Sequence, residues 1–506
     1  MAALFFISLL VPFLIGFSLG LFFLPPGERR ISPLFRVVLG MGAGIGVVSL
    51  VGFGFLFLPG RFSFLLREVT LAAFAAALFW AAWRKGLLRA SFARAKGEKR
   101  RDRRWYLTVL PLAVTALSAA ASFALAAYRE PHGKWDAFLI WNMHARFLFR
   151  SGADWMDYFR SGLDWTHPDY PYLLPLSVVR SWEYCGGETI AAPIFIAALF
   201  TLLVAGLLWT ALGALRNEEQ GGLAAMLLAA SPLFVLVGAS QLADIPLSFF
   251  ILGAIVVPFL HDRQEKPRAT SLAMAGLLAG LAAWTKNEGI LFCAIFLLIR
   301  PVITYFAEGT RRAAGEFFSL AAGAAPALLV LLFFKTAVAP GSDLIASQNA
   351  GGFLDKLGDA GRYGTVLMSY LRTGLTFTQG IPDVRAPFLL NPVIPGVILL
   401  AAYLALSGLA RDPRDSRGGL TGWVVIVLTL AGYFFVFIIT PHDLKWHLLT
   451  ALNRLFLQLW PSAIFLVFMA ARSYRPAAAE EPPGEDKKMR DKSARAPLRQ
   501  KKGRKE

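Results

Sequence analysis

Long apolar runs, separated by short polar segments, constrain this chain more than any other feature. A helix needs roughly 20 apolar residues to cross a bilayer. Hydrophobic residues make up 56% of the 506 residues, and a soluble fold would leave much of this surface exposed. The sequence therefore predicts an all-α polytopic membrane protein. About thirteen runs are long enough to span the membrane, and they fall at 3–24, 35–58, 66–83, 105–128, 189–214, 222–240, 244–260, 270–286, 288–306, 317–339, 387–410, 420–440 and 455–473.

The net charge of +18 is concentrated in a few loops and in the C-terminal tail. This distribution indicates an orienting role in the membrane and no nucleic-acid partner. Segment 84–104 alone carries ten Lys and Arg residues, so we expect it to stay in the cytoplasm. Alternating spans then place the N-terminus outside and the tail 474–506 inside, in the inner cell membrane. The two cysteines, Cys185 and Cys293, provide no disulfide framework.

The loops assigned to the outer side collect the unusual polar residues, including five of the six histidines. The basic residues alone set the topology, yet the candidate chemistry gathers on one side, which indicates an active site at the outer surface. The longest of the early loops, 129–188, far exceeds an ordinary connection, and we expect it to be the catalytic loop. The other outer segments are 239–243, 285–288, 340–386 and 441–454.

The catalytic loop contains two notable segments. Asp136 precedes an expected interfacial helix at 137–150, so its carboxylate is either a helix cap or a reactive group, and the two roles are compatible. The segment 167–171, His-Pro-Asp-Tyr-Pro, is too rich in proline for a helix. We expect a stiff strap with extended residues before each proline, and an ordinary re-entry turn is the alternative.

Later loops add further charged groups. Asp244 stands where two spans turn around, as a cap or a site acid. Lys286 and Glu288 interrupt an apolar stretch and need partners or water, although they could form only a structural ion pair. In the last outer loop, a helix would place Arg454 on the same face as His447, while Lys445 has the alternative of snorkelling to the interface.

Acids and cations together suit a reaction in which a phosphate departs while a hydroxyl or amine attacks. The order and common sidedness of these motifs resemble the GT-C superfamily of integral membrane glycosyltransferases, nearest to the lipid A aminoarabinose transferase and protein O-mannosyltransferase group. The resemblance covers about 105–471. It departs at Ala137, where the family often has a second acid, and the three spans before Trp105 lie outside the usual core.

The resemblance implies transfer of a sugar from a polyprenyl phosphate donor to a glycan, lipid or protein acceptor, generally with inversion, at the extracytoplasmic face. It implies Asp136 as the catalytic base and Lys286 with Arg454 as ligands of the donor phosphate. Asp136, Asp244 and His167 are also candidates for holding a divalent metal. We expect seven residues to shape the substrate pocket, namely His167, Asp169, Tyr170, Asp244, Glu288, His442 and His447.

The expected organisation has three parts. Residues 1–104 form three extra transmembrane helices and a basic cytoplasmic loop, 105–473 form the catalytic core, and 474–506 form a disordered basic tail. Within the core, 340–386 is expected to cover the site. A transporter or flippase of a polyprenyl-linked or anionic substrate is the main alternative, and it would place Asp244 and Lys286 at mid-membrane. A non-catalytic assembly scaffold is a third alternative.

Overall fold

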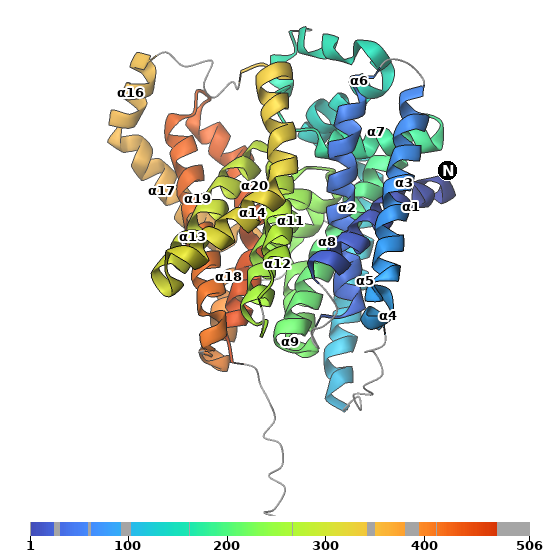
Figure 1. Ribbon diagram of the computed structural model, residues 1–506. Helices are drawn as coiled ribbons and strands as arrows, with labels where there is room; N and C mark the ends of the chain where they lie inside the picture. Colours follow the sequence, from blue (N-terminus) through green and yellow to red (C-terminus); the bar gives the residue numbers. More distant parts are fainter. Residues whose placement is uncertain are drawn as a thin grey trace, which may run out of the picture.

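The computed structural model describes residues 2–24, 31–58, 62–92, 103–160, 162–265, 267–341, 350–379, 394–410 and 412–472. These residues form a bundle of α-helices (Figure 1), with one isolated β-bridge between Leu409 and Ala471. The expected fold class is confirmed. The main helices are α1 (Ala2–Phe23), α2 (Pro33–Phe55), α3 (Phe62–Arg84), α4 (Leu87–Phe92), α5 (Arg103–Arg129), α8 (Ala191–Leu215), α9 (Glu218–Ala229), α10 (Pro232–Ala239), α11 (Asp244–Asp262), α12 (Ala269–Ala283), α13 (Asn287–Glu308), α14 (Thr310–Phe333), α16 (Ala350–Gly358), α17 (Ala360–Thr376), α18 (Gly396–Ser407), α19 (Ser416–Ile439) and α20 (Leu444–Ala470).

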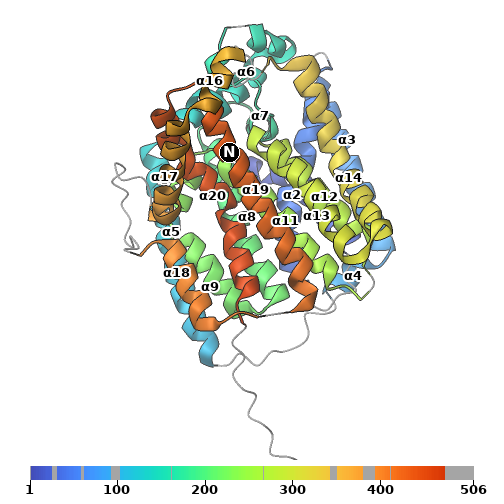
Figure 2. The same ribbon diagram turned by 90° about the vertical axis from the view of Figure 1, so that its left-hand side faces the viewer.

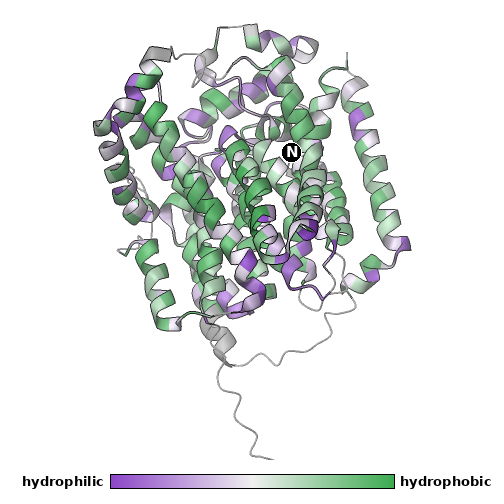
Figure 3. Cartoon of the chain, turned by 60° about the vertical axis from the view of Figure 1, so that its left-hand side comes forward, coloured by the Kyte–Doolittle hydropathy of each residue, from purple (hydrophilic) through white to green (hydrophobic). Residues whose placement is uncertain are grey.

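Each expected apolar run contains a helix or a helix pair, although residues 387–393 of the run 387–410 and residue 473 lie outside the described residues. In the described part of the chain, 10 helices are long and apolar enough to cross a membrane, and the number rises to 11 if a bent pair of helices counts as one span. The bent pair is α9 and α10, which meet at 68° where Ser231 and Pro232 interrupt the expected single span 222–240. The shorter apolar helices α12 and α18 occupy the remaining two runs. Figure 3 shows hydrophobic residues along most of the helical length, as a protein solvated by lipid requires.

Helix α11 lies at the centre of the bundle. The part of α11 that is long enough to cross a membrane is fully buried, and the helix packs against α8, α12, α19 and α20. A helix that is apolar on every side is stable only when other helices surround it. Asp244, the first residue of α11, therefore enters a position enclosed by several helices.

The extra helices belong to the bundle, because α1 and α2 pack against α7 (Leu173–Cys185) and α12, and α3 packs against α1. Helices α1 and α2 cross at glycines, where a Cβ on Gly16 would lie 1.7 Å from the carbonyl oxygen of Gly40. Small residues permit such close approach between helices in a membrane.

The segment 129–188 forms a cap of short helices over one end of the bundle, seen around α6 and α7 in Figures 1 and 2. The expected interfacial helix at 137–150 corresponds to η1 and α6. Of the expected cover 340–386, the described part is mainly helical, as α16 and α17, while 342–349 and 380–386 lie outside the described residues, as does the tail 474–506. The elements of the cap are η1 (Ala137–Trp141), α6 (Asn142–Ser151), η2 (Gly152–Arg160), η3 (Asp164–Thr166) and α7 (Leu173–Cys185).

Candidate active site

Arg454 joins the two acids that sequence reasoning singled out. It lies on α20, and its Nη1 is 2.5 Å from Oδ2 of Asp136 and 3.7 Å from Oδ2 of Asp244. Its Nε donates to the carbonyl oxygen of Thr450, which directs the guanidinium along the helix. Two carboxylates from distant segments therefore share one cation, and Nη2 has no partner among the described residues.

Asp244 is the most buried acid of this site, with 1% of its surface exposed. Its Oδ1 accepts hydrogen bonds from Lys286 at 3.1 Å and from Gln458 at 2.6 Å, and Tyr433 donates to Gln458 in turn. Its buried Oδ2 has no hydrogen-bond donor in the described part of the chain, although Arg454 lies nearby. A buried carboxylate oxygen with lone pairs to spare is suited to a hydroxyl of a bound substrate.

Lys286 connects Asp244 with Glu288. Its ammonium lies 2.7 Å from Oε1 of Glu288, and it precedes the first residue of α13. The alternative of an isolated structural ion pair is thus wrong, because the lysine also contacts Asp244. Asp244 and Glu288 lie in the first turns of α11 and α13, and Lys286 directly precedes α13.

Asp136 is not a helix cap. Its backbone is already helical, with φ −65° and ψ −33°, and its side chain makes no capping hydrogen bond. A capping residue needs extended backbone angles, so the side chain is free of that role and turns to Arg454. The helix continues into the π-helical segment η1, a form that is frequent at functional sites.

The strap 167–171 lies between η3 and α7 as a non-helical segment, as expected, and the backbone N–H of Tyr170 donates to the carbonyl oxygen of His167 at 3.0 Å, so the alternative of a turn is confirmed over 167–170. The expected extended geometry is wrong at His167, whose φ is +51°, a left-handed conformation that is uncommon outside glycine. The rings of His167 and Trp141 each stack on the ring of Tyr170, with centroid distances of 5.0 Å and 5.3 Å. Burial raises the pKa of Tyr170 well above its ordinary value, and the nearby carboxylates of Glu288 and Asp169 raise it further.

Asp169 belongs to a second polar group, which borders the first. Its Oδ2 accepts hydrogen bonds from Asn287 at 2.8 Å and from Lys335 at 3.2 Å. Asn287 lies between Lys286 and Glu288 in the sequence, so it connects this group to the site around Arg454. Lys335 lies in the π-helical segment η4 (Phe334–Val338), which extends α14.

The two histidines of the last outer segment surround Thr440. Nδ1 of His447 lies 2.8 Å from the Thr440 hydroxyl, and the backbone N–H of His442 donates to the same oxygen. Their rings also pack against each other, 5.7 Å apart. Of this segment, Arg454 is the residue that reaches the two acids, and the histidines stay predictions for the substrate pocket.

The turn between α10 and α11 fixes the start of the segment 129–188. Gln241 has φ +59°, and its side chain accepts a hydrogen bond from Asn142 and donates one to the carbonyl oxygen of Pro131. These bonds hold the segment around Asp136 against the start of α11. Asp136 and Asp244 are therefore placed relative to each other by the backbone as well as by Arg454.

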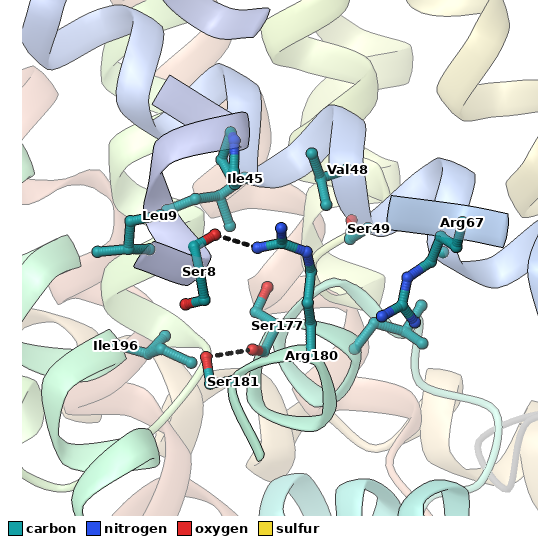
Figure 4. A pocket seen from close by; sticks show the side chains of 13 residues that line it. Ser8, Leu9, Ile45, Val48, Ser49, Arg67, Ser177, Arg180, Ser181 and Ile196 are labelled. Carbon is teal, nitrogen blue, oxygen red and sulfur yellow. Dashed lines mark hydrogen bonds between the residues drawn. The ribbon is translucent and has the colours of Figure 1, made fainter. Parts of the chain in front are cut away.

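A buried ion network fixes α7, which follows the strap, to the extra helix α3. Glu68 accepts hydrogen bonds from Arg67, Arg180 and Tyr184, and Arg67 also binds Glu183. Figure 4 shows Arg180 reaching the backbone carbonyl of Ser8 on α1, beside a small cavity. The N-terminal helices thus anchor the helix that carries the strap.

Another charged cluster lies near the opposite end of the bundle. His261, Asp262 and Glu316 are the one group of three potential metal ligands found in the described residues. Arg300 already pairs with both carboxylates, at 2.6 Å and 2.8 Å, so their charges are compensated, whereas the buried Nε2 of His261 has no hydrogen-bond partner in the described part of the chain. A metal held by Asp136, Asp244 and His167 stays a prediction.

Sequence reasoning missed Gln458, Asn287 and Lys335. Lys335 was the detectable one, because it is a lone basic residue inside the apolar run 317–339, where a charge is costly without partners. Gln458 carries no such signal, since an amide in a long helix has many ordinary roles.

One comparison with known proteins gives a match. Residues 181–334 match the model of the family described as dolichyl-phosphate-mannose-protein mannosyltransferase. The matched segment contains Asp244, Lys286 and Glu288, whereas Asp136 and Arg454 lie on either side of it. Neither the curated proteins nor the solved structures gave a significant match. The family match confirms the predicted resemblance over residues 181–334, and the protein is a polytopic membrane protein with a segment similar to a mannosyltransferase family of the GT-C type.

Proposed function

We propose that this protein transfers a sugar from a polyprenyl phosphate donor to an acceptor at the extracytoplasmic face of the membrane, with inversion at the anomeric carbon. The observation that carries the proposal is Arg454, which lies between Asp136 and Asp244. The family match supports a glycosyltransferase with a lipid-linked sugar donor. The acceptor is a glycan, a lipid or a protein.

The proposal gives a role to three charged groups, Asp136, Arg454 and Lys286. Asp136 uses Oδ2 for Arg454, and its Oδ1 takes the proton from the acceptor's hydroxyl or amine. The acceptor forms a bond to the anomeric carbon while the bond from that carbon to the phosphate oxygen breaks, and the electron pair leaves with the lipid phosphate. Arg454 and Lys286 stabilise the charge that grows on the leaving oxygen. Attack from the face opposite the phosphate inverts the anomeric centre.

The distribution of basic residues supports the extracytoplasmic side. The cap with α6 and α7 lies at one end of the bundle, and α4 with the start of α5 lies toward the other end (Figure 1). The segment joining α4 and α5 contains the most basic stretch of the chain, which favours the cytoplasm. A cysteine in place of exposed Trp165, in a Cys185→Ser background, tests this: an impermeant maleimide should label it in intact cells, and no labelling would contradict the assignment.

The reaction is tested with purified full-length protein and a panel of polyprenyl phosphate sugars. The expected result is release of polyprenyl phosphate with at least one donor, and loss of release in Asp136→Asn and Lys286→Ala. Exposed Asp355 on α16 provides the matched control, as Asp355→Asn. Transfer at the wild-type rate by Asp136→Asn and Lys286→Ala would overturn the assigned roles. Donor translocation across sealed vesicles without release would favour the transporter alternative.

A further inference from the structure

Lys335 occupies an unusual place in the fold. Two π-helical segments occur in the described residues, η1 directly after Asp136 and η4 around Lys335. Such segments cost hydrogen-bond regularity and are frequent at functional sites. Segment η1 follows Asp136, the proposed base of the reaction, and segment η4 contains Lys335.

The ammonium of Lys335 is saturated by protein oxygens. It donates to the backbone oxygen of Asp169 at 2.5 Å, to the carboxylate of Asp169 at 3.2 Å and to Oδ1 of Asn287 at 2.8 Å. A lysine ammonium has three donors, and three acceptors are present. Lys335 therefore has no donor left for a phosphate, in contrast to Arg454.

These contacts join three elements. Lys335 extends from α14, Asn287 is the first residue of α13, and Asp169 belongs to the strap. Asp169 is 3% exposed, so its carboxylate depends on Lys335 and Asn287 for compensation. The strap also begins with a left-handed residue, His167, a conformation that persists only where the surroundings hold it.

We propose that Lys335 is a positioning residue that fixes the strap against the start of α13, and thereby sets the place of Tyr170 and Lys286 in the sugar-transfer site. We call Lys335, Asp169 and Asn287 the strap latch. The proposal rests on the proposed function for its effect on catalysis, while its structural part is independent of that function. Tyr170 directly follows Asp169, so the stacking of its ring on the rings of Trp141 and His167 depends on the position of the strap.

The test compares Lys335→Met with Lys335→Arg in the full-length protein, with exposed Lys445→Met as the matched control. We measure kcat and KM for the polyprenyl phosphate sugar, together with amide hydrogen exchange over residues 166–175. For Lys335→Met we expect kcat to fall about 100-fold, because a misplacement of about 1 Å has that effect. We expect KM for the donor to change little, and exchange in the strap to rise at least about tenfold, the equivalent of one lost charge-assisted hydrogen bond.

Two further variants separate positioning from folding. Lys335→Arg keeps a cation with several donors, so partial recovery of kcat is expected. The double variant Lys335→Met with Asp169→Asn removes both charges, so it should regain the melting temperature of the wild type but keep the fast strap exchange. A melting temperature that recovers together with kcat would overturn the proposal, since the lysine would then serve stability alone.

Other outcomes are equally decisive. Unchanged strap exchange and unchanged kcat in Lys335→Met would overturn the proposal, and so would an effect confined to KM, which would mean direct donor binding. If the wild type transfers no sugar from any donor, the proposed function fails, and the exchange measurement still decides whether the strap latch exists.

Discussion

Substitution of Arg454 by methionine removes the cation that two carboxylates share. At 3.7 Å and an effective dielectric constant of about 20, its attraction to Asp244 amounts to about 4.5 kcal/mol. Lys286 remains as a counter-ion of Asp244, and the side chain of Asp136 is 29% exposed to water. Lysine and water together therefore offset about half of the lost attraction. We therefore expect a loss of about 2 kcal/mol of stability.

The loss of activity should be larger than the loss of stability. Arg454 is also assigned to the departing phosphate, and removal of one such donor slows catalysis about 100- to 1000-fold. The assay is release of polyprenyl phosphate at saturating donor, with thermal unfolding followed by the fluorescence of the 13 tryptophans. Arg454→Lys should have a kcat between those of the wild type and the methionine variant, since lysine keeps the positive charge but lacks the planar set of donors of the guanidinium. A methionine variant that folds and keeps more than about a tenth of the wild-type kcat would refute this reasoning.

Three further predictions concern the surroundings of the site. Glu68→Gln should lower the free energy of unfolding by about 3 kcal/mol, because Glu68 is buried between two arginines. Glu188→Gln, in an exposed ion pair, should lower it by less than about 1 kcal/mol, and chemical denaturation measures both. Burial lowers the pKa of His144 to about 3, so between pH 6.5 and pH 3 the unfolded chain binds a proton that the folded chain does not. The free energy of unfolding should therefore fall by about 1.4 kcal/mol between neutral pH and pH 5.5. A His144→Gln variant that loses the same stability at pH 5.5 contradicts the assignment. Chelation with EDTA tests the metal prediction: if Asp136, Asp244 and His167 hold a divalent ion, activity should disappear and return with added Mg²⁺ or Mn²⁺.

The helices were predictable because lipid imposes a length and a composition on every span. The break between α9 and α10 was harder to foresee, since the apolar run continues through Ser231 and Pro232 and only the backbone reveals the turn. Proline at the first position of a helix was the available signal.

The site was predictable by residue type and not by pairing. Asp136 and Arg454 are 318 positions apart, and no local pattern connects them. The capping role of Asp136 failed because the chain is already helical there. The extended geometry failed at His167, where tertiary contacts maintain a left-handed residue that local preference disfavours.

The location of Arg454 on α20 has a consequence for biosynthesis. Asp136, Asp244 and Lys286 enter the membrane early in translation, but their shared guanidinium arrives only with the last of the described helices. Until that helix inserts, Asp136 lacks its counter-charge and Lys286 is the one cation of the site available to the leaving phosphate. A nascent chain still on the ribosome would therefore be inert toward the lipid carrier pool, and catalytic competence would mark the completion of membrane insertion.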